Sequence, residues 1–166
     1  MRICLALISL LYLSYYNPCF GNKRVEYALS EKDSVISREY SLITQIRGQE
    51  ITGICLINIS LDSGVVGTVI NEMGVKAFDF SYSNGKVNIF NVVNPLNKWY
   101  IRKILKKDFL FILSNLDETG CFKEAVWKKR TLVLSSDNKI VVDDNRYKVT
   151  YTFIPMRRIS DNNEAN

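Results

Sequence analysis

The chain has 166 residues, with 22 Lys and Arg against 17 Asp and Glu, four cysteines and no histidine. This length accommodates one domain, or one domain plus a targeting segment, and a hydrophobic content of 47% is typical of a folded globular protein. The absence of histidine excludes a Ser-His-Asp triad, a Cys-His dyad and a histidine-based zinc site.

Residues 1–21 predict an export signal. Arg2 precedes an uncharged, mostly apolar run at 3–16, which is shorter than the roughly 20 residues that a membrane-spanning helix needs. Two processing routes stay open: cleavage after Gly21, or attachment of lipid to Cys19 as in bacterial lipoproteins. An uncleaved anchor is a less favoured third alternative. We expect a polar tether at 22–37 to follow this segment.

Two cysteines remain after the export signal, and we expect both to be free thiols. Cys55 lies on an apolar strand face, where a buried free thiol is the ordinary interpretation. Cys121 lies far from it in sequence. Export permits a disulfide, but this spacing does not predict one.

Short apolar runs separated by turn residues predict a series of β-strands. Asn84-Gly85 is the strongest hairpin signal, because both turn positions favour the left-handed backbone region. Folding at this turn pairs Tyr82 with Val87 and Phe80 with Ile89 on one apolar face. The strand candidates, about eight in all, are residues 40–46, 51–61, 65–71, 75–83, 86–93, 131–135, 139–142 and 147–153.

The fold class that follows is mainly β, with some helix. Strands at short spacing with hairpin-length links predict an antiparallel meander, which can close as a barrel, a half-barrel or a sandwich. One domain is expected over 38–158. The polar residues 159–166 are expected to be a disordered tail.

The segment 96–107 predicts a basic amphipathic helix, with continuation to 116 left open because 109–113 is apolar all round. Its cations occupy one half of the helical surface: Lys98, Arg102, Lys103, Lys106 and Lys107. Its apolar stripe on the other half comprises Tyr100, Ile101, Ile104 and Leu105, and it continues at Phe111 and Ile112. The basic half is either a solvated helix face or a contact for anionic lipid or an acidic partner.

The acidic residues give no catalytic pattern. Asp143 with Asp144 is a carboxylate pair that a hairpin turn explains better than an active site does. Asp108 projects onto the apolar face of the helix, where it either caps a second element or is a buried carboxylate that needs a partner; we expect the cap. No calcium loop or phosphate-binding glycine loop is present, so we expect no catalytic residue, no metal site and no cofactor.

The leader, the polar tether, the meander and the inserted helix together resemble the LolA/LolB-like group of bacterial envelope proteins. Two stretches, 67–82 and 105–110, also look like uncharacterised lipoproteins of Bacteroidetes with that fold. The resemblance implies a half-barrel closed by one or two helices, with an apolar inside that holds acyl chains. No residue matches the acyl-releasing arginine or the protruding leucine loop of the family.

We therefore expect a non-enzymatic exported protein of the periplasm or outer membrane, with a lipid or acyl group bound in an apolar cavity. The expected walls are Phe78, Phe80, Tyr82, Ile89, Tyr100, Ile101, Ile104 and Leu105. The alternative is a structural or assembly module with a filled core that binds another envelope protein. In either case the basic helix face would lie at a membrane surface or partner, and nucleic acid is not an expected ligand because the protein is exported. The oligomeric state is left open.

Overall fold

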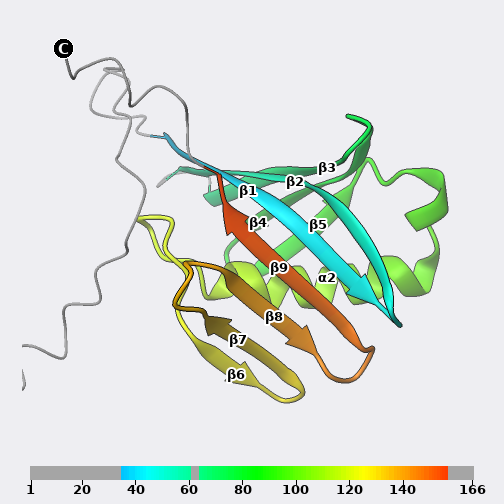
Figure 1. Cartoon of the computed structure of the whole chain (residues 1–166). Helices are drawn as coiled ribbons and strands as arrows, with labels where there is room; N and C mark the ends of the chain where they lie inside the picture. Colours follow the sequence, from blue (N-terminus) through cyan, green and yellow to red (C-terminus); the bar gives the residue numbers. More distant parts are fainter. Residues whose placement is uncertain (1–34, 61–63, 157–166) are drawn as a thin grey trace, which may run out of the picture.

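The computed structural model describes residues 35–60 and 64–156, and within them the chain forms one antiparallel sheet of nine strands with one α-helix (Figure 1). This confirms the mainly β class and the meander. The strands are β1 (Val35–Ile46), β2 (Gln49–Ser60), β3 (Gly64–Asn71), β4 (Lys76–Ser83), β5 (Lys86–Phe90), β6 (Ala125–Trp127), β7 (Arg130–Leu134), β8 (Ile140–Asp144) and β9 (Val149–Pro155). The 3₁₀-helix η1 (Asn94–Leu96) leads into α2 (Trp99–Ser114).

The sheet is an open half-barrel whose two halves meet at a long-range pairing. The strand order is β5-β4-β3-β2-β1-β9-β8-β7-β6, so β1 to β5 form one meander and β6 to β9 form another. Strand β9 joins them by pairing with β1. The helix α2 connects the two edge strands and covers one face of the curved sheet (Figure 1).

Local hairpins have the expected register. Asn84 and Gly85 have φ values of 51° and 70°, as their turn requires. Tyr82 then pairs with Val87 and Phe80 with Ile89, which confirms the sequence-based pairing. The ring of Phe80 lies over Gly67, where an added Cβ would come within 2.3 Å of the ring.

The core lies between the covered face of the sheet and α2. Leu105, Phe109 and Ile112 recur at helical spacing and are buried, which explains why this segment forms a helix against the sheet. The ring centroid of Phe109 lies 5.2 Å from that of Phe78 and 4.9 Å from that of Phe80. Aromatic side chains from the sheet and the helix therefore fill the interface together.

Some element boundaries differ from the sequence prediction. The helix runs unbroken through residue 114, because its second half is covered by the sheet and so accommodates apolar residues on most sides. Strand β1 begins at Val35, so residues 35–37 belong to the sheet and not to a tether. Strand β6 was not predicted, since three residues are too few for a periodic pattern.

The predicted export signal, the lipidation site Cys19, residues 22–34 of the tether and the tail at 159–166 lie outside the described residues. Within 35–60 and 64–156, no helix combines the length and hydrophobicity needed to cross a bilayer.

The two remaining cysteines differ from each other. Cys55 is free and buried, as expected, and burial raises the pKa of its thiol well above the ordinary value. Cys121 is disulfide-bonded, so the prediction of two free thiols is wrong for this residue. Cys121 lies in the half-exposed segment after α2 rather than on a core-facing strand, and Cys55 is not its partner.

Candidate functional site

The predicted apolar walls are brought together between the sheet and α2. Phe78, Phe80, Ile89 and Leu105 are buried in one hydrophobic cluster. Tyr82 and Ile101 are partly buried against the same cluster, and Ile104 is partly buried as well. Because Phe109 packs directly on Phe78 and Phe80, these walls contact protein side chains along this part of the interface.

Tyr100 does not belong to these walls. It is 51% exposed and packs edge-to-face against Trp99, with ring centroids 6.0 Å apart. Trp99 is itself 76% exposed. Both residues belong to the first turn of α2, so both aromatic rings lie on the surface at the start of the helix.

The predicted basic face covers the first half of α2. Lys98, Arg102, Lys103 and Lys106 are exposed, and Lys107 is partly exposed. Arg102 donates hydrogen bonds to the carbonyl oxygen of Ile89 (2.9 Å) and to Oδ1 of Asn97 (3.1 Å), which attaches the helix to β5. The other cations of this face extend outward from the helix. We call Lys98, Trp99, Tyr100, Arg102, Lys103, Lys106 and Lys107 the α2 basic surface.

The charges of the α2 basic surface oppose the helix dipole. No side chain caps the N-terminus of α2, and its first turn contains no acidic residue. Its last turn contains no basic residue, although cations stabilise a helix at that end. The distribution of Lys and Arg on this helix is therefore not explained by helix stability.

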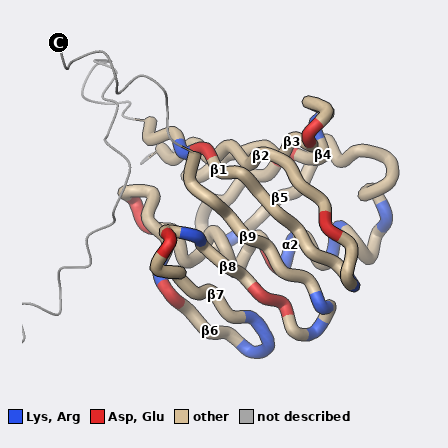
Figure 2. Tube along the Cα trace, viewed as in Figure 1, with Lys and Arg blue, Asp and Glu red and all other residues tan. Residues whose placement is uncertain are grey.

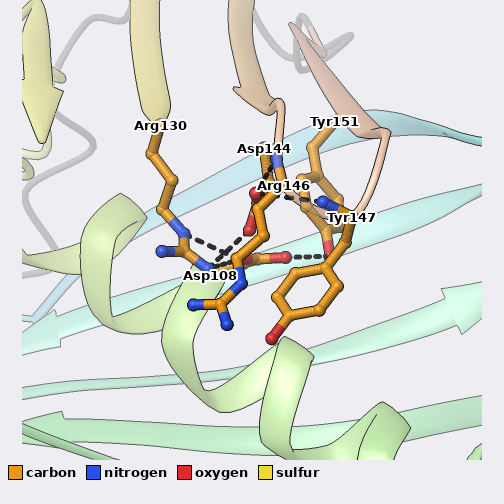
Figure 3. Close-up of polar contacts among 6 residues, drawn as sticks. All are labelled: Asp108, Arg130, Asp144, Arg146, Tyr147 and Tyr151. Carbon is orange, nitrogen blue, oxygen red and sulfur yellow. Dashed lines mark hydrogen bonds and ion pairs between the residues drawn. The ribbon is translucent and has the colours of Figure 1, made fainter. Parts of the chain in front are cut away.

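A buried polar cluster joins α2 to the second meander (Figure 3). Nε and Nη2 of Arg130 lie 2.9 and 2.8 Å from Oδ1 of Asp108, and Nη2 lies 2.5 Å from Oδ2 of Asp144. The hydroxyl of Tyr151 donates to Oδ2 of Asp108 at 2.9 Å. One cation thus bridges two carboxylates that come from the helix and from β8. We call these four residues the buried ionic cluster.

The surrounding residues shield the buried ionic cluster from solvent. The side chains of Arg130, Asp108 and Asp144 are 6%, 1% and 1% exposed. Oδ1 of Asp144 accepts a hydrogen bond from the backbone N–H of Arg146 at 2.8 Å, which fixes the turn after β8. The ring of Trp127 lies 6.0 Å from the guanidinium of Arg130. Dissolved substrates do not reach these side chains in this arrangement.

The electrostatics of the buried ionic cluster favour one retained proton. Burial raises the pKa of Asp108 to about 7, and its hydrogen bond with Asp144 acts in the same direction, whereas Arg130 and Tyr151 oppose the shift. Burial also raises the pKa of Tyr151 well above its ordinary value, and the Asp108 charge adds to this. With two carboxylates and one guanidinium in a buried space, a proton held near Asp108 balances the charge.

Sequence reasoning missed this cluster. The expectation that Asp108 caps a second element is wrong, because the helix continues through it and Arg130 supplies the partner that a buried carboxylate needs. The available signal was an acidic residue on an apolar helix face. Arg130 was concealed in the basic run 128–130, where its burial could not be distinguished from the exposure of its neighbours.

In the described parts of the chain, no three cysteine or carboxylate side chains converge as a metal site would require. The buried ionic cluster has only two carboxylates and contains its own cation, so it has the composition of a structural joint between helix and sheet.

A comparison of this chain with known protein families finds no match, and a comparison with curated proteins finds none either.

Proposed function

We propose that this protein is a non-enzymatic module of the cell envelope that binds an anionic membrane surface through the α2 basic surface. The observation that carries the proposal is the placement of exposed cations and exposed aromatic rings at the end of α2 where cations weaken the helix. Such a placement is understandable if the charges serve a contact outside the molecule.

The chemistry of the α2 basic surface suits a lipid headgroup region. Lysine and arginine attract anionic lipids, while tryptophan and tyrosine favour the boundary between headgroups and acyl chains. Trp99 and Tyr100 are exposed beside Lys98 and Lys103, so both kinds of contact are available within two helical turns. The chain also carries a formal net charge of +5, which favours approach to an anionic surface.

Vesicle binding tests the proposal. The purified full chain is mixed with phosphatidylglycerol-containing vesicles and with neutral phosphatidylcholine vesicles, and bound protein is measured by sedimentation over a range of NaCl concentrations. Binding to the neutral vesicles measures the contribution of the apolar run 3–16. Binding to the anionic vesicles should exceed this background. We expect tighter binding to the anionic vesicles and a steep loss of that difference with salt.

The informative variant reverses Lys98, Lys103 and Lys106 to glutamate. Arg102 is left in place because it bonds to Ile89 and Asn97. At about 1 kcal/mol for each basic residue near the membrane, loss of the three positive charges alone lowers the affinity roughly 100-fold, and the three added negative charges lower it further. Glutamate at Lys98 suits the helix dipole, and Lys103 and Lys106 are exposed, so we do not expect unfolding to explain the loss.

The matched control reverses Lys86, Lys123 and Lys139, which changes the net charge equally but leaves α2 intact. Because the lower net charge weakens the general attraction to an anionic surface, this control is expected to lose some binding, but much less than the α2 variant loses. The proposal fails if the α2 variant keeps full binding, or if both variants lose it to the same extent.

Acyl-chain binding between sheet and helix is a second candidate, which the resemblance in sequence layout motivates. Its supporting observation is that Tyr82, Ile101 and Ile104 are only partly buried beside the packed walls. Extraction of the purified protein, followed by mass spectrometry, would detect a co-purifying acyl lipid. A stoichiometric acyl lipid that a Phe78→Trp substitution displaces would favour this function over surface binding alone.

A further inference from the structure

Antiparallel pairing gathers several turns at the end of the sheet where α2 begins. Strands β1, β3, β6 and β8 all finish at this end, so the turns β1–β2, β3–β4, β6–β7 and β8–β9 lie there. Strand β5 also finishes there and leads through η1 to the start of α2. Figure 1 shows η1 and the turns β1–β2 and β8–β9 toward the right-hand end of the sheet.

Two neighbouring turns at this end are strongly basic (Figure 2). The β6–β7 turn carries Lys128 and Lys129, and the β8–β9 turn carries Arg146 and Lys148. The backbone N–H of Asn145 donates to the carbonyl oxygen of Lys129 at 2.9 Å, which places the two turns side by side. We call these four cations the basic turn pair.

Two cations of the basic turn pair lie close to aromatic rings, and the two acidic residues nearest to the pair in sequence are engaged elsewhere. Asp144 is buried and bound to Arg130, and the partly buried Asp143 accepts a hydrogen bond from the hydroxyl of Thr150 at 2.6 Å. Nζ of Lys128 lies 4.6 Å from the Trp127 ring centroid, and the guanidinium of Arg146 lies 5.4 Å from that of Tyr147. Trp127 is 44% exposed, so this surface combines cations with an accessible aromatic ring, as the α2 basic surface does.

In these turns, two lysines occupy backbone conformations that other residue types adopt at a lower cost in folding free energy. Lys128 and Lys148 have φ values of 58° and 55°, in the left-handed region that costs an ordinary side chain free energy. At the opposite end of the sheet, the corresponding positions in β4–β5 and β7–β8 are Asn84 and Asn138, which tolerate this region. The β1–β2 turn, at the basic end, again has a cation there, Arg47, with φ of 51°.

We infer that the basic turn pair is a second contact with the anionic lipid surface, so that the molecule binds by the end of its sheet together with the start of α2. The inference rests on the proposed function and extends it to residues on the other meander. The positive charge of the basic turn pair is complementary to the negative charge of anionic lipid headgroups. A contact with these headgroups also explains why lysines occupy left-handed positions where asparagine would fold more easily. Residues that trade backbone stability for a contact are expected where the contact is functional.

A double substitution separates binding from folding. Lys128→Asn with Lys148→Asn removes two charges and places a tolerant residue at each left-handed position. We expect the thermal unfolding midpoint of the full chain to rise and its affinity for phosphatidylglycerol vesicles to fall roughly 10- to 30-fold. The control, Lys86→Asn with Lys123→Asn, removes the same charge at the opposite end of the sheet and should lower the affinity for vesicles much less than the Lys128/Lys148 variant does.

The result that overturns the inference is full vesicle binding by the Lys128/Lys148 variant. If the Lys98/Lys103/Lys106 variant loses binding in the same assay, the proposed function stands and only the second contact is removed. If both variants bind fully, both proposals fall. Tighter binding of the unmodified protein to soluble polyglutamate than to anionic vesicles would also overturn the inference, because the surface would then suit an acidic protein.

Discussion

Replacing Asp108 with asparagine tests whether the buried ionic cluster holds a proton near neutral pH. The pKa of this carboxyl is about 7 in the folded protein, because burial outweighs the attraction of Arg130. In the unfolded chain the pKa of an aspartate is about 3.9. Between these values the folded state binds a proton that the unfolded state has released, so the free energy of unfolding falls as pH rises.

The expected size follows from the difference between the two pKa values. Each pH unit in this window changes the free energy of unfolding by about 1.4 kcal/mol, and about three units give about 4 kcal/mol. This contribution is fully present below pH 4 and is lost by about pH 7. The pKa values of Asp79 and Asp117 are lowered in the fold, so these residues weaken the protein only as pH falls below their ordinary range of about 4.

Urea unfolding at pH 4.5 and pH 7.5, followed by tryptophan fluorescence, measures the effect. The unmodified protein should lose stability between the two values, whereas Asp108→Asn should vary little because asparagine cannot ionise. Asp137→Asn makes the same chemical change at a side chain that is 68% exposed, and should retain the pH dependence of the unmodified protein. Equal stability of the unmodified protein at both pH values would refute the retained proton.

Two further substitutions probe the attachment of α2 to the sheet. Arg130→Met leaves Asp108 and Asp144 buried without their cation and should lower the free energy of unfolding by about 3–5 kcal/mol in urea unfolding. Adding Asp108→Asn to this variant should restore part of the lost stability. Absence of any restoration would contradict the conclusion that the unpaired buried charges cause the loss. Phe109→Ala removes a ring that is 1% exposed and should cost about 3–5 kcal/mol, whereas Phe90→Ala, at a side chain 43% exposed, should cost much less. Similar unfolding midpoints for the two phenylalanine variants would contradict the packing described for α2.

Local features of this fold were predictable from neighbouring residues. Asn84-Gly85 specified a hairpin and its register, because the turn needs left-handed residues and the flanking runs alternate. The apolar spacing from Tyr100 to Ile112 predicted a helix, although its phase placed Tyr100 on the core face and the structure exposes it. Periodicity reports the direction of a side chain, but the exposure of the first turn depends on where the sheet ends.

The buried ionic cluster was not predictable in the same way. Arg130 and Tyr151 lie 22 and 43 residues from Asp108 along the chain, and they meet only because α2 crosses the sheet to reach the second meander. Burial of the cluster also determines its chemistry, since an exposed aspartate beside an arginine would have a lowered pKa rather than a raised one. The preference for a cap at Asp108 failed for this reason.

The sequence by itself determined that the chain is a β meander with one basic helix, since hairpin turns and side-chain periodicity depend on neighbouring residues. Only the tertiary structure decided that β9 pairs with β1, and hence that α2 spans from one edge strand to the other. That pairing gathers the basic turn pair at the end of the sheet where α2 begins, and encloses Asp108 with Arg130. These juxtapositions depend on contacts between distant segments, which the local pattern of residues does not encode.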